Sequence, residues 1–237
     1  MLITIDAVYV PESLPEASIR EWTSRIAPDK RRKIAKFVRQ EDRYRALLGE
    51  LLIRSTVIGH TPLRNADIRY AYNEYGKPSL ENGTNFSFNL SHSGRWVVLA
   101  WSASRLPLGV DVEQIAPVDF RIAESFFSPK ESAALFARPD EERLHYFYRL
   151  WTLKESYIKA LGKGLSMPLD RFTVMPTGSD GWHSPEAPDY RFVSFPLDAG
   201  HLAAACSSSD ALPGEARILS WDELQERLLR EPPLAES

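Results

Sequence analysis

The sequence contains very little cysteine. Cys206 is the single cysteine among 237 residues, and it lies in a run of small apolar residues at 203–206. One cysteine excludes both an internal disulfide and a cysteine-based zinc cluster. We therefore expect the chain to work in a reducing compartment, the cytoplasm.

Long hydrophobic runs and a large net charge are also absent. No run approaches the roughly 18 apolar residues that a membrane-spanning helix needs. Residues 1–10 contain an acid and no basic stretch, unlike the start of a signal peptide. The net charge of -3 argues against general affinity for nucleic acid. With 43% hydrophobic and 26% charged residues the composition is ordinary for a globular protein, so we expect neither a membrane nor a nucleic-acid partner.

The spacing of apolar residues predicts strands and helices that alternate in two cycles. The first cycle comprises a strand at 1–10, helices at 16–27 and 29–59, and strands at 68–72, 85–90 and 96–101, with a tight turn at 91–94. The second comprises a strand at 108–113, helices at 121–124, 129–136 and 140–161, and strands at 172–175, 190–196 and 201–207. Exposed loops are expected at 73–78 and 176–189, and a short strand and helix in 208–237.

The two cycles share one order of elements: a strand, then helices, then an antiparallel meander. No repeat of the sequence itself accompanies this order. The pattern predicts an α+β fold of two similar halves with antiparallel sheets and a cleft between them. We place the halves at 1–105 and 106–221, followed by a loose tail at 222–237.

Three carboxylates stand out on two of the expected elements. Asp111 and Glu113 share one face of a strand because side chains two apart point the same way. Glu155 and Lys159 lie one turn apart on a helix. If the three acids converge, they form a site for a hard cation such as Mg²⁺ beside a lysine, and a phosphate-bearing substrate is the first expectation. Taken singly, the acids also fit the wet face of a strand, and a surface ion pair worth about 0.3–0.5 kcal/mol.

Basic residues gather in one stretch near the start of the chain. They are Arg25, Lys30, Arg31, Arg32, Lys33, Lys36, Arg39, Arg43, Arg45 and Arg54. Such a cluster is typical of a solvated helix face, or of a surface that binds an anion. The cluster alone does not decide between the two.

Five motifs in a fixed order carry a resemblance to a known family. They are Tyr75-Gly76-Lys77-Pro78, Phe88-Asn89-Leu90-Ser91-His92-Ser93, Gly109-Val110-Asp111-Val112-Glu113, Phe126-Phe127-Ser128, and Trp151-Thr152-Leu153-Lys154-Glu155-Ser156-Tyr157-Ile158-Lys159-Ala160. In this order the chain resembles the Sfp-type 4′-phosphopantetheinyl transferases, from the basic helix at Lys30 to the meander near Cys206. The acidic motif paired with the last motif is the most specific part.

The resemblance implies a fold, a reaction and partners. Coenzyme A would bind as co-substrate in the cleft between two similar halves. Its 4′-phosphopantetheine arm would pass to a serine of an apo peptidyl or acyl carrier protein, leaving adenosine 3′,5′-bisphosphate. Because one chain supplies both halves of the cleft, we expect a monomer.

The resemblance also implies roles for individual residues. Asp111, Glu113 and Glu155 would hold Mg²⁺ against the coenzyme diphosphate, with Lys159 against the same phosphates. Glu131 would deprotonate the carrier serine, although a glutamate after Pro129 also suits the first turn of any helix. Lys154 is a second candidate for that step, provided that burial lowers its pKa.

The same family position assigns residues to the coenzyme. Lys30, Lys33, Ser91 and His92 would surround the 3′-phosphate with Arg45 nearby, and Gly76, Lys77 and Pro78 would contact the adenine side. Ala46 departs from relatives that carry a hydroxyl there, which puts the detail of 3′-phosphate binding in question.

Two other classes of function share these features. A Mg²⁺-dependent hydrolase of nucleotide diphosphates would use the same acids with an aimed water and no protein partner. A binding module that has lost catalysis would be marked by a missing metal ligand, whereas all three expected ligands are present.

Overall fold

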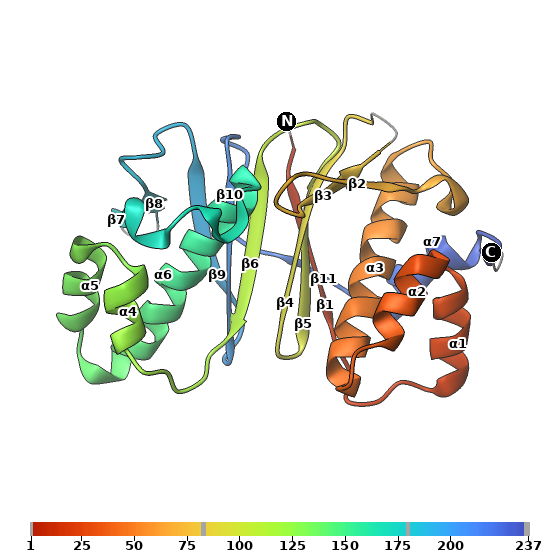
Figure 1. Cartoon of the computed structure of the whole chain (residues 1–237), viewed down its shortest axis with the longest axis horizontal. Helices are drawn as coiled ribbons and strands as arrows, with labels where there is room; N and C mark the ends of the chain where they lie inside the picture. Colours follow the sequence, from red (N-terminus) through yellow and green to blue (C-terminus); the bar gives the residue numbers. More distant parts are fainter. Residues whose placement is uncertain (1, 82–83, 179–180, 235–237) are drawn as a thin grey trace.

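The fold consists of two groups of helices with the strands between them (Figure 1). The computed structural model describes residues 2–81, 84–178 and 181–234. Within this part of the chain, no helix is both long and apolar enough to cross a membrane.

The first group of elements lies within residues 4–102. It comprises β1 (Thr4–Tyr9), α1 (Glu16–Ser24), α2 (Pro28–Ala35), α3 (Gln40–His60), a 3₁₀ turn (Asn65–Asp67), β2 (Tyr70–Tyr72), β3 (Pro78–Leu80), β4 (Ser87–Ser93) and β5 (Trp96–Ser102). The second comprises β6 (Leu108–Gln114), α4 (Arg121–Phe126), α5 (Pro129–Phe136), α6 (Asp140–Leu161), 3₁₀ turns (Gly164–Ser166 and Leu169–Arg171), β7 (Met175–Thr177), β8 (Gly181–His183), β9 (Arg191–Asp198) and β10 (His201–Ser207). The elements β11 (Arg217–Leu219) and α7 (Trp221–Leu229) follow.

The two sheets repeat one topology. The first has the order β11-β1-β5-β4 and the second the order β6-β10-β9-β8-β7. In each, the opening strand of the half pairs antiparallel with the last strand of its meander, which pairs antiparallel with the strand before it. This confirms the pseudo-duplicated α+β fold that the order of elements predicts.

The sheets pack against each other, and the helices cover their outer faces. In β5, Trp96, Val98 and Ala100 belong to the core between the sheets. The alternate residues Val97 and Leu99 belong to the core beneath the helices of the first half. Every residue of β5 is therefore buried, which explains why its sequence is apolar from Trp96 to Trp101.

Strand β6 shows the same alternation with a different outcome. Val110 and Val112 pack in the core between the sheets. Asp111 and Glu113 take the opposite face, where they border the same depression as residues of α6. The period of two along a strand thus directs both acids to one side.

Gly109 lets α6 lie directly against β6. A Cβ at this position would lie 2.0 Å from the carbonyl oxygen of Ser156 and 2.4 Å from the amide nitrogen of Ala160. Both are backbone atoms of α6, so a side chain here would force the helix away from the strand. The glycine in the acidic motif therefore fixes the distance between the two elements.

We expect Gly109→Ala to lower the free energy of unfolding by about 1–3 kcal/mol, because α6 must shift to accommodate the methyl group. Urea unfolding of both proteins would measure this. Gly214→Ala is the matched control, since a Cβ there meets nothing within 4 Å. Equal midpoints for wild type and Gly109→Ala would contradict the close packing.

Several predicted boundaries are wrong. The helix expected at 29–59 is two helices, α2 and α3, separated by residues 36–39. The side chain of Val38 in this break is 98% exposed, so it makes no packing contact that would hold a continuous helix. The strand expected at 172–175 begins only at Met175. The loop expected at 176–189 contains the end of β7 and all of β8, and Ser184 and Ala187 within it are buried. Strands of three residues are too short to show a period of two, so the sequence did not reveal them.

The C-terminal segment also differs from the expected division. Strand β11 pairs in parallel with β1, the opening strand of the first half. Leu224 and Leu228 of α7 are buried in the core of the first half. The structure therefore places 217–229 with the first half, neither in a second half ending at 221 nor in a loose tail from 222.

Candidate active site

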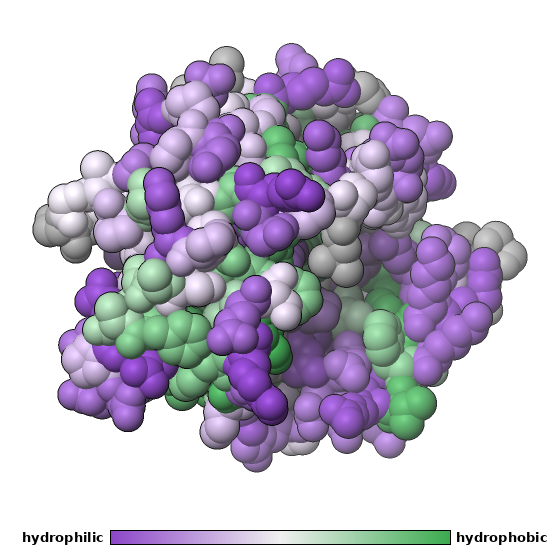
Figure 2. Space-filling view, turned by 60° about the vertical axis from the view of Figure 1, so that its left-hand side comes forward, coloured by the Kyte–Doolittle hydropathy of each residue, from purple (hydrophilic) through white to green (hydrophobic). Residues whose placement is uncertain are grey.

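A depression forms where strands β4 and β6 meet helix α6. Its volume is about 350 Å³, and its lining residues are Leu90, Ser91, His92, Asp111, Glu113, Trp151, Glu155 and Lys159. Figure 2, turned so that the second half comes forward, shows a surface that is hollowed and has both hydrophilic and hydrophobic residues beside the hollow. The three carboxylates and the lysine that the sequence singles out therefore line one depression.

Asp111 lies at the centre of the polar contacts. The Lys159 ammonium donates to its Oδ1 at 2.6 Å, and the Ser91 hydroxyl donates to the same oxygen at 2.9 Å. Asp111 is only 3% exposed. Its Oδ2 is buried and has no hydrogen-bond partner within the described residues. A buried carboxylate oxygen with no donor is unusual, since such atoms are nearly always satisfied.

The pKa values of the two glutamates in the depression, Glu113 and Glu155, are both raised. Burial, followed by the charge of Asp111, raises the pKa of Glu113 to about 7. Burial and Asp111 also raise the pKa of Glu155. The Ser93 hydroxyl donates to Glu113 Oε2 at 2.8 Å. Carboxylates that raise one another's pKa values are stabilised when a cation joins them.

The donor set fits a hard divalent cation by chemistry. Three carboxylates around one depression, with a buried oxygen that lacks a donor, are ligands that Mg²⁺ accepts. As the side chains lie, however, no group of three or more His, Cys, Asp or Glu in the described part of the chain is arranged to hold a metal ion. Lys159 is bound to Asp111 instead.

Side chains of β4 hold β6 in place across the boundary between the halves. Four alternate residues accept hydrogen bonds from backbone N–H groups at or just before β6. The pairs are Ser87 with Leu106 (2.9 Å), Asn89 with Val110 (2.8 Å), Ser91 with Val112 (3.3 Å) and Ser93 with Gln114 (3.1 Å). They satisfy the open edge of the second sheet, which otherwise ends at β6.

Sequence reasoning missed this row of contacts. It assigned Ser91 to a phosphate and gave Ser87, Asn89 and Ser93 no role. The signal was the strict alternation of small polar residues along β4, which is typical of a strand with one wet face and equally of one that pairs with another edge.

Of the residues predicted to bind the coenzyme, only Ser91, His92 and Lys159 line the depression. His92 lines the depression, where partial desolvation of its ring, followed by the charge of Arg45, lowers its pKa. Arg45 donates to the Gly94 carbonyl and to Asp42, both at 2.6 Å. Lys33 is exposed.

Lys30 lies in a different environment. Its ammonium is 3.6 Å from Glu50 Oε2 and 4.8 Å from the centre of the Tyr70 ring. Burial alone would lower the pKa of Lys30, but Glu50 and Tyr72 outweigh it, so the pKa is raised. The structure therefore shows Lys30 paired within the first half.

The loop between β2 and β3 carries Gly76, Lys77 and Pro78. Gly76 has φ +84°, which favours glycine. Lys77 and Pro78 line a small cavity of about 150 Å³ together with Phe86 and Phe88. The ammonium of Lys77 donates to carbonyls of the second half.

Glu131 and Lys154 form a buried ion pair away from the lining of the depression. The Lys154 ammonium lies 2.6 Å from Glu131 Oε2, and the two side chains are 0% and 1% exposed. It also donates to the Phe172 carbonyl at 2.6 Å. Burial lowers the pKa of Lys154, as a base role requires, while Glu131 acts in the opposite sense.

Glu131 also serves the local structure. It accepts from the backbone N–H of Ser128, in the capping box that begins α5, and from that of Val174. The contacts of Glu131 are thus those of a residue that joins α5, α6 and the segment before β7. The structure does not bring it to the three acids.

Comparison with known proteins gives one family for both halves. Residues 107–206 match the 4′-phosphopantetheinyl transferase superfamily. Residues 15–104 match the N-terminal part described for 4′-phosphopantetheinyl transferases.

Individual relatives extend this match along the chain. The chain is 38% identical over 224 residues to 4′-phosphopantetheinyl transferase Sfp of Bacillus subtilis (strain 168), covering 93% of this chain and 99% of the relative. It is 39% identical over 167 residues to 4′-phosphopantetheinyl transferase gsp of Aneurinibacillus migulanus, covering 70% and 69%. The crystal structure of Thermotoga maritima holo-[acyl-carrier-protein] synthase aligns over 44% of this chain and 63% of its own at 18% identity, with a TM-score of 0.34, too weak to add support. With a relative of this identity matched along nearly its whole length, the chain belongs to the Sfp-type 4′-phosphopantetheinyl transferases, enzymes that transfer phosphopantetheine to carrier proteins.

Proposed function

We propose that this chain transfers the 4′-phosphopantetheine arm of coenzyme A to a serine of an apo peptidyl or acyl carrier protein in a Mg²⁺-dependent reaction. The observation that carries the proposal is the depression in which Asp111, Glu113, Glu155 and Lys159 meet. A diphosphate repels an incoming alkoxide, so the site must supply positive charge at the reacting phosphorus.

The reaction exchanges one phosphorus–oxygen bond for another. The serine oxygen bonds to the phosphorus next to the pantetheine arm and releases its proton to water, and the bond from that phosphorus to the bridging oxygen breaks. Adenosine 3′,5′-bisphosphate leaves with the bridging oxygen. A Mg²⁺ ion held by Asp111, Glu113 and Glu155 would stabilise the charge that develops on that oxygen.

Lys159 acts on the same charge. Its ammonium is held at Asp111 and Ser91, so it is oriented before any substrate arrives. With a metal ion bound to the carboxylates, the ammonium would stay within the depression and donate to a phosphate oxygen, a charge-assisted hydrogen bond of the stronger kind.

The coenzyme 3′-phosphate fits the basic side of the depression. We propose that His92, Lys33 and Arg45 bind it, together with Ser91 and with Lys30 once Lys30 leaves Glu50. Lys77 and Pro78 line a cavity of about 150 Å³, which we propose for the adenine side of the coenzyme. Because both halves that border the depression belong to one chain, we propose that the enzyme acts as a monomer, in the cytoplasm.

The carrier serine must lose a proton, for which the sequence predicts Glu131 or Lys154. Both side chains are buried and bound to each other, so neither reaches a substrate without opening of the second half. We therefore propose that this pair stabilises the fold.

Intact-mass analysis of an apo carrier protein tests the proposed function. Incubation with enzyme, coenzyme A and Mg²⁺ should add the mass of one phosphopantetheine unit, and a chelator should prevent it. Coenzyme A cleavage without a change in the carrier mass would favour the hydrolase instead. Binding without either product would favour the non-catalytic module.

We expect the stabilisation by Mg²⁺ to grow with pH. The folded state raises the pKa of Glu113 to about 7. Below that pH the folded protein therefore binds more protons than the unfolded chain. Without a metal ion, the free energy of unfolding that Glu113 contributes falls as the pH rises from its ordinary pKa toward 7. A metal ion must displace that proton. The rise in Tm at fixed Mg²⁺ should therefore be larger at about pH 8 than at about pH 6. Glu113→Gln should reduce the difference, and the remainder is expected from Glu155, whose pKa is also raised. Equal rises in wild type at both pH values would contradict the metal assignment of Glu113.

A further inference from the structure

Lys77 belongs to the first half, but its ammonium is bound to the second. It lies in the loop between β2 and β3, and Nζ donates to the carbonyls of Leu108 at 2.9 Å, Lys159 at 2.6 Å and Ala160 at 3.1 Å. A lysine ammonium has three donors, so these contacts use all of them. None remains for a phosphate or a base.

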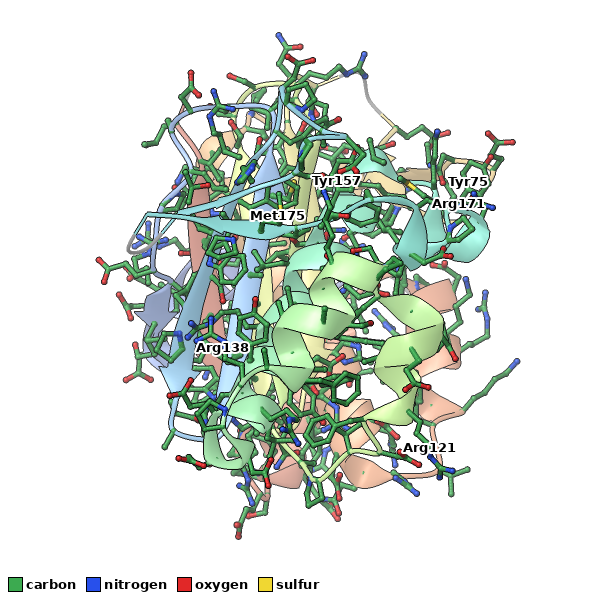
Figure 3. The ribbon with its side chains drawn as sticks, turned by 90° about the vertical axis from the view of Figure 1, so that its left-hand side faces the viewer. Tyr75, Arg121, Arg138, Tyr157, Arg171 and Met175 are labelled. Carbon is green, nitrogen blue, oxygen red and sulfur yellow. The ribbon has the colours of Figure 1, made fainter. Side chains whose placement is uncertain are left out.

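Asn73 of the same loop makes a parallel contact. Its Nδ2 donates to the Gly162 carbonyl at 2.7 Å, while its Oδ1 accepts from the backbone N–H groups of Tyr75 at 3.0 Å and Lys77 at 2.8 Å. A Cβ on Gly164 would lie 3.9 Å from Tyr75 Cβ, which places the loop against the segment after α6. Figure 3 labels Tyr75 and shows it at the end of the molecule where the second half presents Arg171.

Apart from Leu108 of β6, the carbonyls that Lys77 and Asn73 contact lie at the C-terminal end of α6. The last four carbonyls of an α-helix have no partner within the helix, and they form the negative end of its macrodipole. Gly162, in the left-handed conformation at φ +69°, ends α6. Lys77 then supplies a cation and Asn73 a neutral donor to this end, both from the other half of the protein.

The Lys77 ammonium thereby connects β6 and α6, the two elements that carry the acids of the site. Leu108 opens β6, three residues before Asp111, and Lys159 extends its own side chain to Asp111 at 2.6 Å. Lys77 thus holds the backbone of Lys159 next to the strand that carries its partner. Burial lowers the pKa of Lys77 to about 8, so the amine is still mostly charged at neutral pH.

We propose that Lys77, supported by Asn73, is a positioning residue that ties the C-terminal turn of α6 to β6 and so sets the alignment of Lys159 and Glu155 with Asp111. This inference rests on the proposed function of the depression. It differs from the coenzyme contact that the resemblance implies for Lys77, because the ammonium acts through backbone carbonyls of the enzyme.

Lys77→Met tests the inference, with Lys163→Met as the matched control. Lys163 follows the same helix end and is exposed, and its side chain makes no hydrogen bond or ion pair within the part of the chain that the structure describes. We expect Lys77→Met to lower kcat for transfer about tenfold while the Kd for coenzyme A, measured without a carrier, changes less than about threefold. Lys163→Met should change neither. A coenzyme Kd raised tenfold with kcat intact would overturn the inference and make Lys77 a ligand contact.

Hydrogen exchange supplies a readout that does not depend on turnover. Backbone amides at 155–164 should exchange faster in Lys77→Met than in wild type, and unchanged exchange would overturn the inference even if the wild type loads no carrier.

Asn73→Ala keeps the ammonium and should give a smaller loss of kcat. In the double variant the two losses should not be additive, because both residues act on one helix end. If Lys77→Met does not fold, Lys77→Gln, which keeps an N–H donor, takes its place in each measurement.

Discussion

Asparagine in place of Asp111 should lower Mg²⁺-dependent transfer by about 100-fold or more, with little effect on folding. The substitution keeps the shape of the side chain but removes the charge that holds Lys159 and that would hold a metal ion. Removing one preorganised electrostatic contact at a reacting centre costs about 10²- to 10³-fold in rate. Of the three acids, Asp111 is the one whose charge raises the pKa of both others, so its loss changes the whole site.

The measurement is kcat/KM for carrier loading at saturating Mg²⁺, with circular dichroism to show that the fold is kept. Asp119→Asn is the matched control, because Asp119 is an exposed acid paired with Arg121 in the connection after β6. It should load carrier at the wild-type rate. Turnover of Asp111→Asn within a few-fold of wild type would show that the chemistry takes place elsewhere.

Lys154→Met should destabilise the protein by about 3–5 kcal/mol, the usual result of leaving one member of a buried ion pair without its partner. The carboxylate of Glu131 would remain buried, with only the backbone donors of Ser128 and Val174. Lys130→Met, on the exposed face of α5, should change the stability by less than about 0.5 kcal/mol.

The double variant Glu131→Gln with Lys154→Met separates a structural role from a catalytic one. Glutamine at this position still completes a capping box and carries no charge that must be paired. The double variant should therefore regain most of the lost stability in urea unfolding, and its turnover should follow its stability. A double variant that is stable but fails to load carrier would instead establish the base role that the resemblance implies for this pair.

The order of elements along the sequence predicted the two similar α+β halves, and local signals predicted several element boundaries. The boundaries of α5 and α6 are those predicted, because Pro129 with Glu131 marks one start and Gly162 marks one end. The strand period also predicted that Asp111 and Glu113 share a face, and the helix period predicted the same for Glu155 and Lys159. These are local properties, which follow from the geometry of a single element.

Contacts between distant segments were decided only by the tertiary structure. The motif around Lys77 resembles one that contacts the coenzyme in the family. In the fold, however, the Lys77 ammonium binds the end of α6, where the Lys159 carbonyl lies 82 positions along the chain. The sequence predicts a short strand and helix in 208–237 but not their partners, and only the structure shows that β11 pairs with β1 in the first sheet.

By itself, then, the sequence determined which side chains face together on each strand and helix, and through its motifs the family. The tertiary structure decided which partner each polar group meets, since a lysine or serine satisfies its donors with whatever acceptor packing brings near. Asp111 shows both: its face follows from the strand, whereas its pairing with Lys159 depends on Gly109 and on how closely α6 packs against β6.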